Sequence, residues 1–254
     1  MDVLISKKKH ILTITFNRPA KKNAITRAMY QTITNALNNA ENDAEVRVIL
    51  FTGKQEIFTA GNDLYDFLQN PPQSTKSPVY QFIQNLSHAT KPVIAAVSGL
   101  AVGIGTTLLL HCDFVYAAEN VRFSLPFAKL GLCPEFASSL LLPQIAGYQR
   151  AAEKLLLGEE FSAQEALAMG FVNKVLPPAE VLAFAKAQAA KLVALPKSSL
   201  WVTKRLMKGK QIAAIEAKIK EESVHFSEML VSKEAKEAFT AFFEKRKPDF
   251  TKFK

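Results

Sequence analysis

Short runs of aliphatic residues alternate with segments of helical periodicity through the first two thirds of the chain, and this alternation restricts the fold more than any other feature. Leu12, Ile14 and Phe16 alternate with threonines, which predicts a strand with one buried face. Residues 46–51, 93–97 and 114–117 are rich in aliphatic and aromatic side chains, as expected of strands buried on both faces. Strands separated by helices predict right-handed parallel crossovers and therefore an α/β fold.

Local signals mark where helices begin and end. Thr26 can cap a helix that carries apolar residues at helical spacing, and residues 162–165 form a capping box whose helix can end at Gly170. From about Pro178 onward the strand signals vanish, and Pro196 separates one helix from the next. We therefore expect a core of residues 1–195, which carries the functional site, and a helical C-terminal module of residues 196–254 that serves oligomerisation.

Composition excludes several classes of protein. The chain has 254 residues, of which 48% are hydrophobic and 22% charged, so one large globular domain or a domain with an appendage is expected. Two cysteines argue against a disulfide scaffold and for a reducing, cytoplasmic location. The four histidines stand far apart, so no metal site is expected. Residues 92–110 carry no charge, but their glycines indicate a buried strand, a turn and a helix start instead of a membrane span.

The formal net charge of +9 is compatible with a nucleic-acid partner, a membrane surface or an anionic small ligand. The basic residues are scattered and do not form a block with interleaved aromatic residues. Most of them are therefore expected on a solvated surface, no nucleic-acid partner is expected, and a phosphate-bearing ligand is the functional alternative for a few.

Two glycine-containing segments could present backbone amides to a ligand. Small residues around Gly61, in residues 58–64, allow close approach of the main chain, although a plain turn capped by Asp63 is the favoured explanation of this segment taken alone. Residues 99–107 form a glycine-rich turn that opens a buried helix, so that free N–H groups and the positive end of the helix dipole meet at one point. Such a point suits an anion or a developing oxyanion. It is not a dinucleotide fingerprint, because Leu108 stands where the third glycine is required.

A third segment, residues 131–139, contains Glu135 directly after Pro134. We expect Glu135 in the first turn of a helix, where a carboxylate complements the helix dipole. The functional alternative is a proton carrier, because the neighbouring Leu132, Cys133 and Phe136 are apolar and such a setting raises the pKa of a glutamate. Taken alone, the segment favours the first interpretation, in which Glu135 complements the helix dipole.

Taken in order, these segments resemble the crotonase (enoyl-CoA hydratase/isomerase) superfamily. The resemblance runs from Asn-Arg-Pro at residues 17–19, through residues 58–64, 91–107 and 123–131, to Lys-Arg-Lys-Pro-Asp-Phe at residues 245–250. It implies a crotonase-like spiral of ββα turns with a C-terminal helical trimerisation module, and an acyl-CoA substrate. A homotrimer or a dimer of trimers is then expected, with no cofactor beyond the coenzyme A that is part of the substrate.

The resemblance also implies roles for individual residues. The backbone N–H groups of Asn62 and Ile104 correspond to the oxyanion hole that holds the thioester oxygen. Lys21 and Lys22 stand where a basic residue often meets the CoA phosphates, and Lys252 of a neighbouring subunit is a further candidate. The other positions implied to contact substrate are Ala60, Gly61, Asp63, Leu64, Gly103, Phe127 and Leu132.

Departures from the family pattern predict the reaction. Hydratases of the family hold one water between two glutamates, and these two positions are Thr107 and Phe127 here. Pro134-Glu135 instead resembles the single glutamate of Δ3,Δ2-enoyl-CoA isomerases, above all the peroxisomal type. We therefore expect Glu135 to move a proton from C2 to C4 of a 3-enoyl-CoA. The alternatives are hydration, thioester hydrolysis or decarboxylation at the same glutamate, or a non-catalytic member that binds acyl-CoA or RNA.

Overall fold

Two β-sheets organise the core in the computed structural model, which describes residues 1–54, 57–71 and 76–253. Within these residues the larger sheet has six strands, in the order β1 (Val3–Lys8), β2 (Ile11–Phe16), β3 (Val48–Gly53), β4 (Val93–Val97), β6 (Phe114–Ala118) and β9 (Lys174–Leu176). β1 and β2 are antiparallel, and the other neighbours are parallel. The smaller sheet has the order β5 (Leu100–Val102), β7 (Arg122–Ser124) and β8 (Phe161–Ser162).

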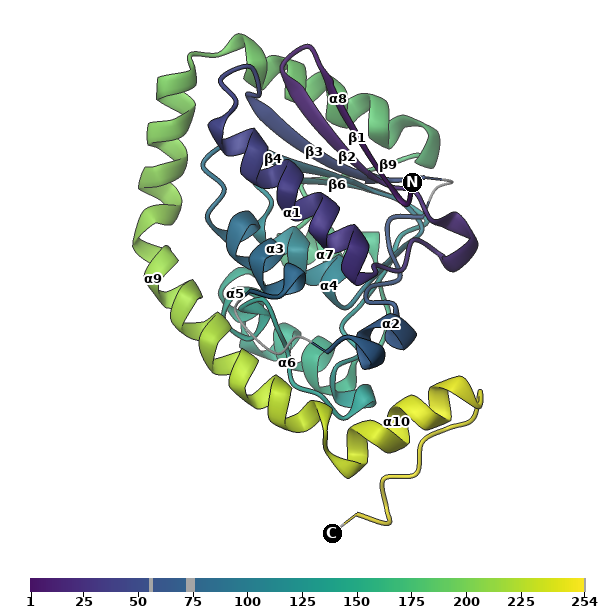
Figure 1. Ribbon diagram of the computed structural model, residues 1–254. Helices are drawn as coiled ribbons and strands as arrows, with labels where there is room; N and C mark the ends of the chain where they lie inside the picture. Colours follow the sequence, from purple (N-terminus) through teal and green to yellow (C-terminus); the bar gives the residue numbers. More distant parts are fainter. Residues whose placement is uncertain (55–56, 72–75, 254) are drawn as a thin grey trace.

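Helices cover both faces of the larger sheet. The helices α1 (Arg27–Asn42) and α3 (Pro78–Ser87) pack against each other on one face, and α8 (Pro178–Ala194) lies across the other (Figure 1). The remaining helices of the core are α2 (Leu64–Gln69), α4 (Ile104–Thr107), α5 (Ser138–Ala146), α6 (Tyr148–Leu157) and α7 (Ala163–Met169), with the 3-10 turns η1 (Pro19–Lys21), η2 (Leu108–His111) and η3 (Ala128–Leu130). The expected α/β architecture with parallel crossovers is thus present.

The predicted local signals act as expected. The Thr26 hydroxyl accepts a hydrogen bond from the Met29 amide at the start of α1, and Ser162 and Glu165 form the capping box of α7. Strand β2 alternates between buried and half-buried residues, whereas the first five residues of β3 and all of β4 are buried. No described helix is long and apolar enough to cross a membrane, and residues 92–110 are divided among β4, β5, α4 and η2.

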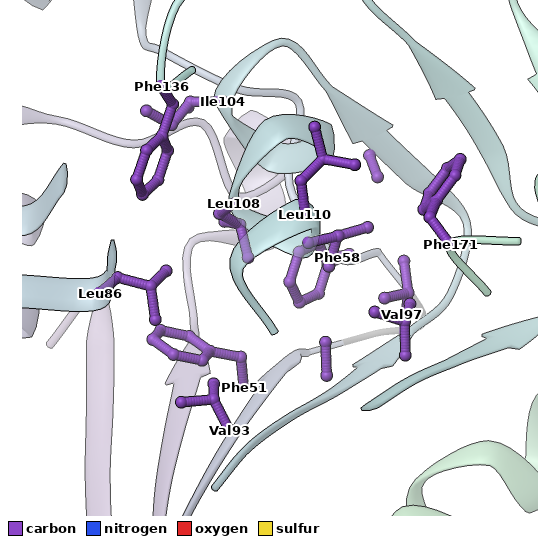
Figure 2. Close-up of a cluster of buried hydrophobic side chains, with 14 of the residues drawn as sticks. Phe51, Phe58, Leu86, Val93, Val97, Ile104, Leu108, Leu110, Phe136 and Phe171 are labelled. Atoms are coloured by element: carbon purple, nitrogen blue, oxygen red, sulfur yellow. The ribbon is translucent and has the colours of Figure 1, made fainter. Parts of the chain in front are cut away.

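A cluster of buried side chains joins the sheet to the short helical segment α4–η2. Figure 2 shows Leu108 and Leu110 of this segment together with Phe51 of β3 and Phe58, and all four are at most 9% exposed. Burying side chains of this size stabilises the fold by about 1.5–3 kcal/mol each. This packing against the sheet fixes the position of the segment that bears Ile104 and Thr107.

The last two helices run along the outside of the core. Helix α9 (Lys197–Leu230) begins directly after Pro196 and passes the whole length of the molecule, and α10 (Lys233–Phe243) packs near η3 (Figure 1). The Lys204 ammonium of α9 donates to the Lys91 carbonyl over 2.7 Å and to Asp113 Oδ2 over 2.6 Å. Because Lys204 is 6% exposed, this contact fixes α9 to the end of the sheet.

We expect Asp113→Ala to lower the free energy of unfolding by about 3–5 kcal/mol, because it leaves a buried ammonium without its counter-charge. Chemical denaturation followed by circular dichroism measures the change. Glu221→Ala, which removes an exposed carboxylate that pairs with Lys218 on helix α9, is the control and should leave the midpoint nearly unchanged. An equal effect of the two substitutions would contradict the structural role of the buried pair.

Candidate active site

A cavity of about 430 Å³ brings the predicted proton carrier together with one of the predicted amide donors. Its wall is largely apolar and comes from α2, α3, the loop before α5, and α9. The described residues that line it are Asn62, Phe67, Ser77, Val79, Tyr80, Ile83, Glu135, Phe136, Lys220, Ser223, Val224, Phe226 and Ser227. Glu135 is the only carboxyl group among them, so one acid faces a largely apolar space.

Glu135 lies in a loop before α5 and not in the first turn of a helix, so that expectation was wrong. The helix begins three residues later, at Ser138, and the two residues between have left-handed backbone, with φ of 60° at Phe136 and 55° at Ala137. The amide and hydroxyl of Ser138 both donate to the Glu135 carbonyl. This turn directs the Glu135 side chain toward the cavity instead of along the helix axis.

The carboxyl of Glu135 sits in an environment that opposes its ionisation. Although part of the residue is accessible through the cavity, burial raises the pKa of Glu135 to about 8, and the nearby Glu222 carboxyl adds to the increase. The Thr107 hydroxyl donates to Glu135 Oε1 over 2.5 Å and acts in the opposite direction, because it stabilises the anion. A carboxyl with a pKa close to neutrality can both accept and return a proton.

Two backbone amides have no acceptor among the described residues, that of Asn62, which lines the cavity, and that of Ile104, the first residue of the helix α4 that bears Thr107. The segments that carry them are held together by main-chain hydrogen bonds, from the Thr59 amide to the Leu100 carbonyl and from the Val102 amide to the Thr59 carbonyl. Gly61 makes the close approach possible, because a Cβ atom there would lie 2.5 Å from the Val102 carbonyl oxygen.

Gly103 and Ile104 form the turn predicted from the sequence. Gly103 has φ of 54° and precedes α4, and the Ile104 side chain is buried. The amides of Thr106 and Thr107 both donate to the Gly103 carbonyl, so the turn is closed at once by helical hydrogen bonds. The amide of Ile104 remains at the helix start, where the peptide dipoles favour negative charge.

The remaining predicted residues occupy several places. Asp63 caps α2 by accepting from the Asp66 amide, as expected, and also pairs with Arg18; Leu64 is the first residue of that helix. Lys22 accepts from the Ala60 amide through its carbonyl, so the exposed Lys21 and Lys22 lie beside the 60–64 loop.

Three further candidates lie outside the cavity wall. Phe127 and Leu132 are both buried and are joined by a hydrogen bond from the Leu132 amide to the Phe127 carbonyl. Lys252 pairs with Glu237 near the C-terminus of its own chain, 2.8 Å away. Their predicted contacts with substrate stay predictions, as does the contribution of a neighbouring subunit.

The structure adds residues that the sequence did not reveal. The Tyr30 hydroxyl donates to Asn62 Oδ1 over 2.6 Å, and burial, together with the charge of Glu135, raises the pKa of Tyr30 well above its usual value. His111 Nε2 donates a hydrogen bond to the Phe136 carbonyl, and the two side-chain rings stack with their centroids 4.0 Å apart. Burial lowers the pKa of His111 to about 3, so this imidazole is neutral. Neither residue belongs to a recognisable motif, and each occurs on the apolar face of its own element.

Comparison with known proteins places this geometry in a family. The chain superposes on the crystal structure of an enoyl-CoA hydratase/isomerase from Pseudoalteromonas atlantica T6c with a TM-score of 0.95 and 39% identity, covering 98% of this chain and 100% of the other. This confirms the predicted crotonase-like fold.

Sequence relatives include both types of enzyme. The chain is 33% identical over 250 residues to the 2,3-dehydroadipyl-CoA hydratase of Escherichia coli K12, covering 98% of each protein. It is 35% identical over 252 residues to the enoyl-CoA delta isomerase 2 of Rattus norvegicus, covering 97% of this chain and 64% of that longer protein. The family model for enoyl-CoA hydratase/isomerase matches residues 6–253, and the chain therefore belongs to this family.

Proposed function

We propose that the protein converts 3-enoyl-CoA to trans-2-enoyl-CoA by a proton shift that Glu135 carries out alone. Membership of the family makes the chain an enzyme that acts on enoyl-CoA thioesters. The observation that favours isomerisation is the composition of the cavity, where Glu135 is the only carboxyl among the described lining residues. One carboxyl is sufficient for a proton shift, because the same group can accept the proton and return it.

The reaction has two steps. The Glu135 carboxylate takes a proton from C2, and the electron pair of that C–H bond moves through the thioester, leaving a dienolate with negative charge on its oxygen. The amides of Asn62 and Ile104 stabilise this charge, and one such donor contributes about 3–4 kcal/mol in the transition state. The protonated Glu135 then delivers its proton to C4, so that the double bond moves from C3–C4 to C2–C3 and the carboxylate is restored.

The surroundings of Glu135 suit this cycle. The Thr107 hydroxyl at 2.5 Å holds the carboxyl in one orientation while leaving its other oxygen available to the substrate. The apolar side chains of Val79, Ile83 and Phe226 line the same cavity and limit the access of water to the dienolate. The reaction needs no metal or redox group, because the thioester carbonyl accepts the electrons.

Hydration is the alternative that the Escherichia coli relative raises. Two groups that can exchange protons are needed to hold and split a water, and the corresponding positions in this chain are Thr107 and Phe127. A threonine hydroxyl does not ionise in the useful range, and a phenylalanine carries no proton to exchange. Hydratase turnover is therefore expected to be slow compared with isomerisation.

Glu135→Gln tests the proton carrier. The amide keeps the shape of the side chain but is not basic, so kcat for a 3-enoyl-CoA should fall about 10²–10⁴-fold or more. The absorbance of the conjugated 2-enoyl thioester measures the rate, and the affinity for free CoA should change little because Glu135 lies at the acyl end. Glu221→Gln, the same change on the exposed surface of α9, is the control and keeps normal turnover. Near wild-type activity of Glu135→Gln, or faster turnover of crotonyl-CoA than of a 3-enoyl-CoA by the unaltered enzyme, would refute the proposal.

The pH dependence follows from the elevated pKa. Because the base must be ionised in the free enzyme, kcat/KM should rise with pH and reach half its maximum near pH 8. Thr107→Val removes a donor that stabilises the anion, so the half-maximal point should move to higher pH.

Lys208 requires a control in the same experiment, because burial lowers its pKa to about 8 as well. Lys208→Met removes this second titration and should leave the rate profile in place. If the half-maximal pH of kcat/KM moves in Lys208→Met but not in Thr107→Val, the titration belongs to Lys208, and the role of Glu135 is contradicted.

A further inference from the structure

The loop that carries Glu135 adopts a backbone that its own sequence does not favour. Phe136 and Ala137 are consecutive non-glycine residues in the left-handed region, where the Cβ atom crowds the following carbonyl. Ala137 is also the residue before α5 and has no side-chain group that could cap the helix. Neighbouring elements must therefore hold this conformation.

Glu222 of α9 supplies the hydrogen-bond acceptors that the loop itself lacks. One carboxylate oxygen, Oε2, accepts from the Ala137 amide over 2.6 Å. The other, Oε1, accepts from the Ser139 amide over 3.0 Å and from the Ser139 hydroxyl over 2.6 Å. Both oxygens are thus satisfied by donors at the start of α5, as the side chain of a helix-capping residue would be, although Glu222 belongs to a different helix.

The main chain of Glu222 contacts the same loop from its other end. The Cys133 thiol donates to the Glu222 carbonyl over 3.7 Å. The loop therefore touches this one residue both before and after Glu135. Glu222 is 5% exposed, and its buried carboxylate is stabilised mainly by its hydrogen bonds, with a smaller contribution from the charge of Lys218.

We propose that Glu222 is the positioning residue of the proton carrier: by holding the amides of Ala137 and Ser139 it fixes the left-handed turn that directs Glu135 toward Thr107. This inference rests on the proposed function, since it assigns Glu222 a role in the reaction of Glu135. Glu222 is not among the described residues that line the cavity, so it positions Glu135 through the loop and not by contact with the reacting carbons.

Glu222 also affects Glu135 through its charge. Glu222 is an acid next to Glu135, and its charge helps to keep the pKa of Glu135 high. The pKa of Glu222 is itself raised by burial, while its three donors oppose this increase. Other titratable groups face the two carboxyls from α1, η2, the loop and α9, and these are Tyr30, His111, Cys133, Lys218 and Lys220.

None of the three groups with shifted pKa among these neighbours titrates near pH 8, where Glu135 does. The pKa of His111 is lowered to about 3, that of Cys133 is raised to about 11, and that of Tyr30 lies well above its usual value. A change in the titration of Glu135 after substitution of Glu222 is therefore a direct effect of the second carboxyl.

Two substitutions distinguish the effect of the length of the Glu222 side chain from the effect of its charge. Glu222→Asp keeps the charge but withdraws it by one methylene, so kcat should fall about 10–100-fold through misplacement of Glu135, with KM little changed and the half-maximal pH near its normal value. Glu222→Gln keeps the length but removes the charge, so kcat should fall and the half-maximal pH of kcat/KM should move lower. Glu221→Gln, the neighbouring exposed glutamate, should alter neither.

Ala137→Gly provides a rescue that also guards against misfolding. Glycine adopts the left-handed conformation without the penalty of a Cβ atom, so in the Glu222→Gln background it should recover part of kcat while the half-maximal pH stays low. A Glu222→Gln protein with normal kcat and normal pH dependence would overturn the proposal. So would a Glu222→Gln/Ala137→Gly protein that is folded by circular dichroism but recovers none of the lost turnover.

A measurement without substrate distinguishes this inference from the proposed function. The carboxyl carbon of Glu135, labelled with ¹³C and assigned by comparison with Glu135→Gln, can be titrated by NMR in the unaltered protein and in Glu222→Gln. We expect the midpoint to move to lower pH in the variant. If the unaltered protein does not isomerise 3-enoyl-CoA but the midpoint moves, the proposed reaction fails and the coupling of the two glutamates stands. If isomerisation occurs and Glu222→Gln changes neither the midpoint nor kcat, the role of Glu222 is refuted.

Discussion

The free-energy cost of placing a carboxylate in an apolar cavity is the constraint on which the arrangement of this site depends. Glu135 faces mainly aliphatic and aromatic side chains, and its pKa of about 8 expresses how weakly that environment supports the anion. The one direct donor to its side chain is the Thr107 hydroxyl, among the residues described. A carboxyl supported more strongly would be a weaker base, so the sparse solvation of Glu135 suits it to the proton transfer proposed above.

The same constraint separates the two reactions of the family in physical terms. Holding a water for addition requires polar groups on two sides, and these would also solvate Glu135 and lower its pKa. In this chain Thr107 offers one hydroxyl and Phe127 is buried without a polar atom in its side chain. The apolar walls therefore favour the chemistry that needs no water and disfavour the chemistry that consumes it.

Local sequence signals predicted most of the sheet and helix layout because they act over a few residues. Thr26, the capping box at Ser162 and the buried strand β4 all take the forms that their neighbours in sequence dictate. The short strands β5, β7 and β8 were not anticipated, since two or three residues carry too little periodicity to be recognised. Contacts with distant partners, which sequence patterns do not contain, determine such elements.

Glu135 illustrates the same limit at the site. Its apolar neighbours and the family resemblance identified it as the candidate base, yet its position after Pro134 suggested a helical first turn. The structure differs because His111 and Glu222, far away in the sequence, hold the peptide groups of Phe136 and Ala137. Glu222 follows another glutamate in a highly charged helix, so nothing in its surroundings in the sequence marks it as buried.

The geometry of α9 explains how a helix outside the core reaches the site. Its buried residues, Lys204, Ile215, Ile219, Glu222 and Leu230, recur at helical spacing and form one narrow stripe. Lys204 and Glu222 are about five turns apart and therefore point to the same side of the helix. One of them is fixed to the sheet through Asp113, and the other is fixed to the loop of Glu135. Because Lys204 and Glu222 belong to one continuous helix, the anchor at Lys204 restricts where Glu222 can lie and, through it, the orientation of Glu135.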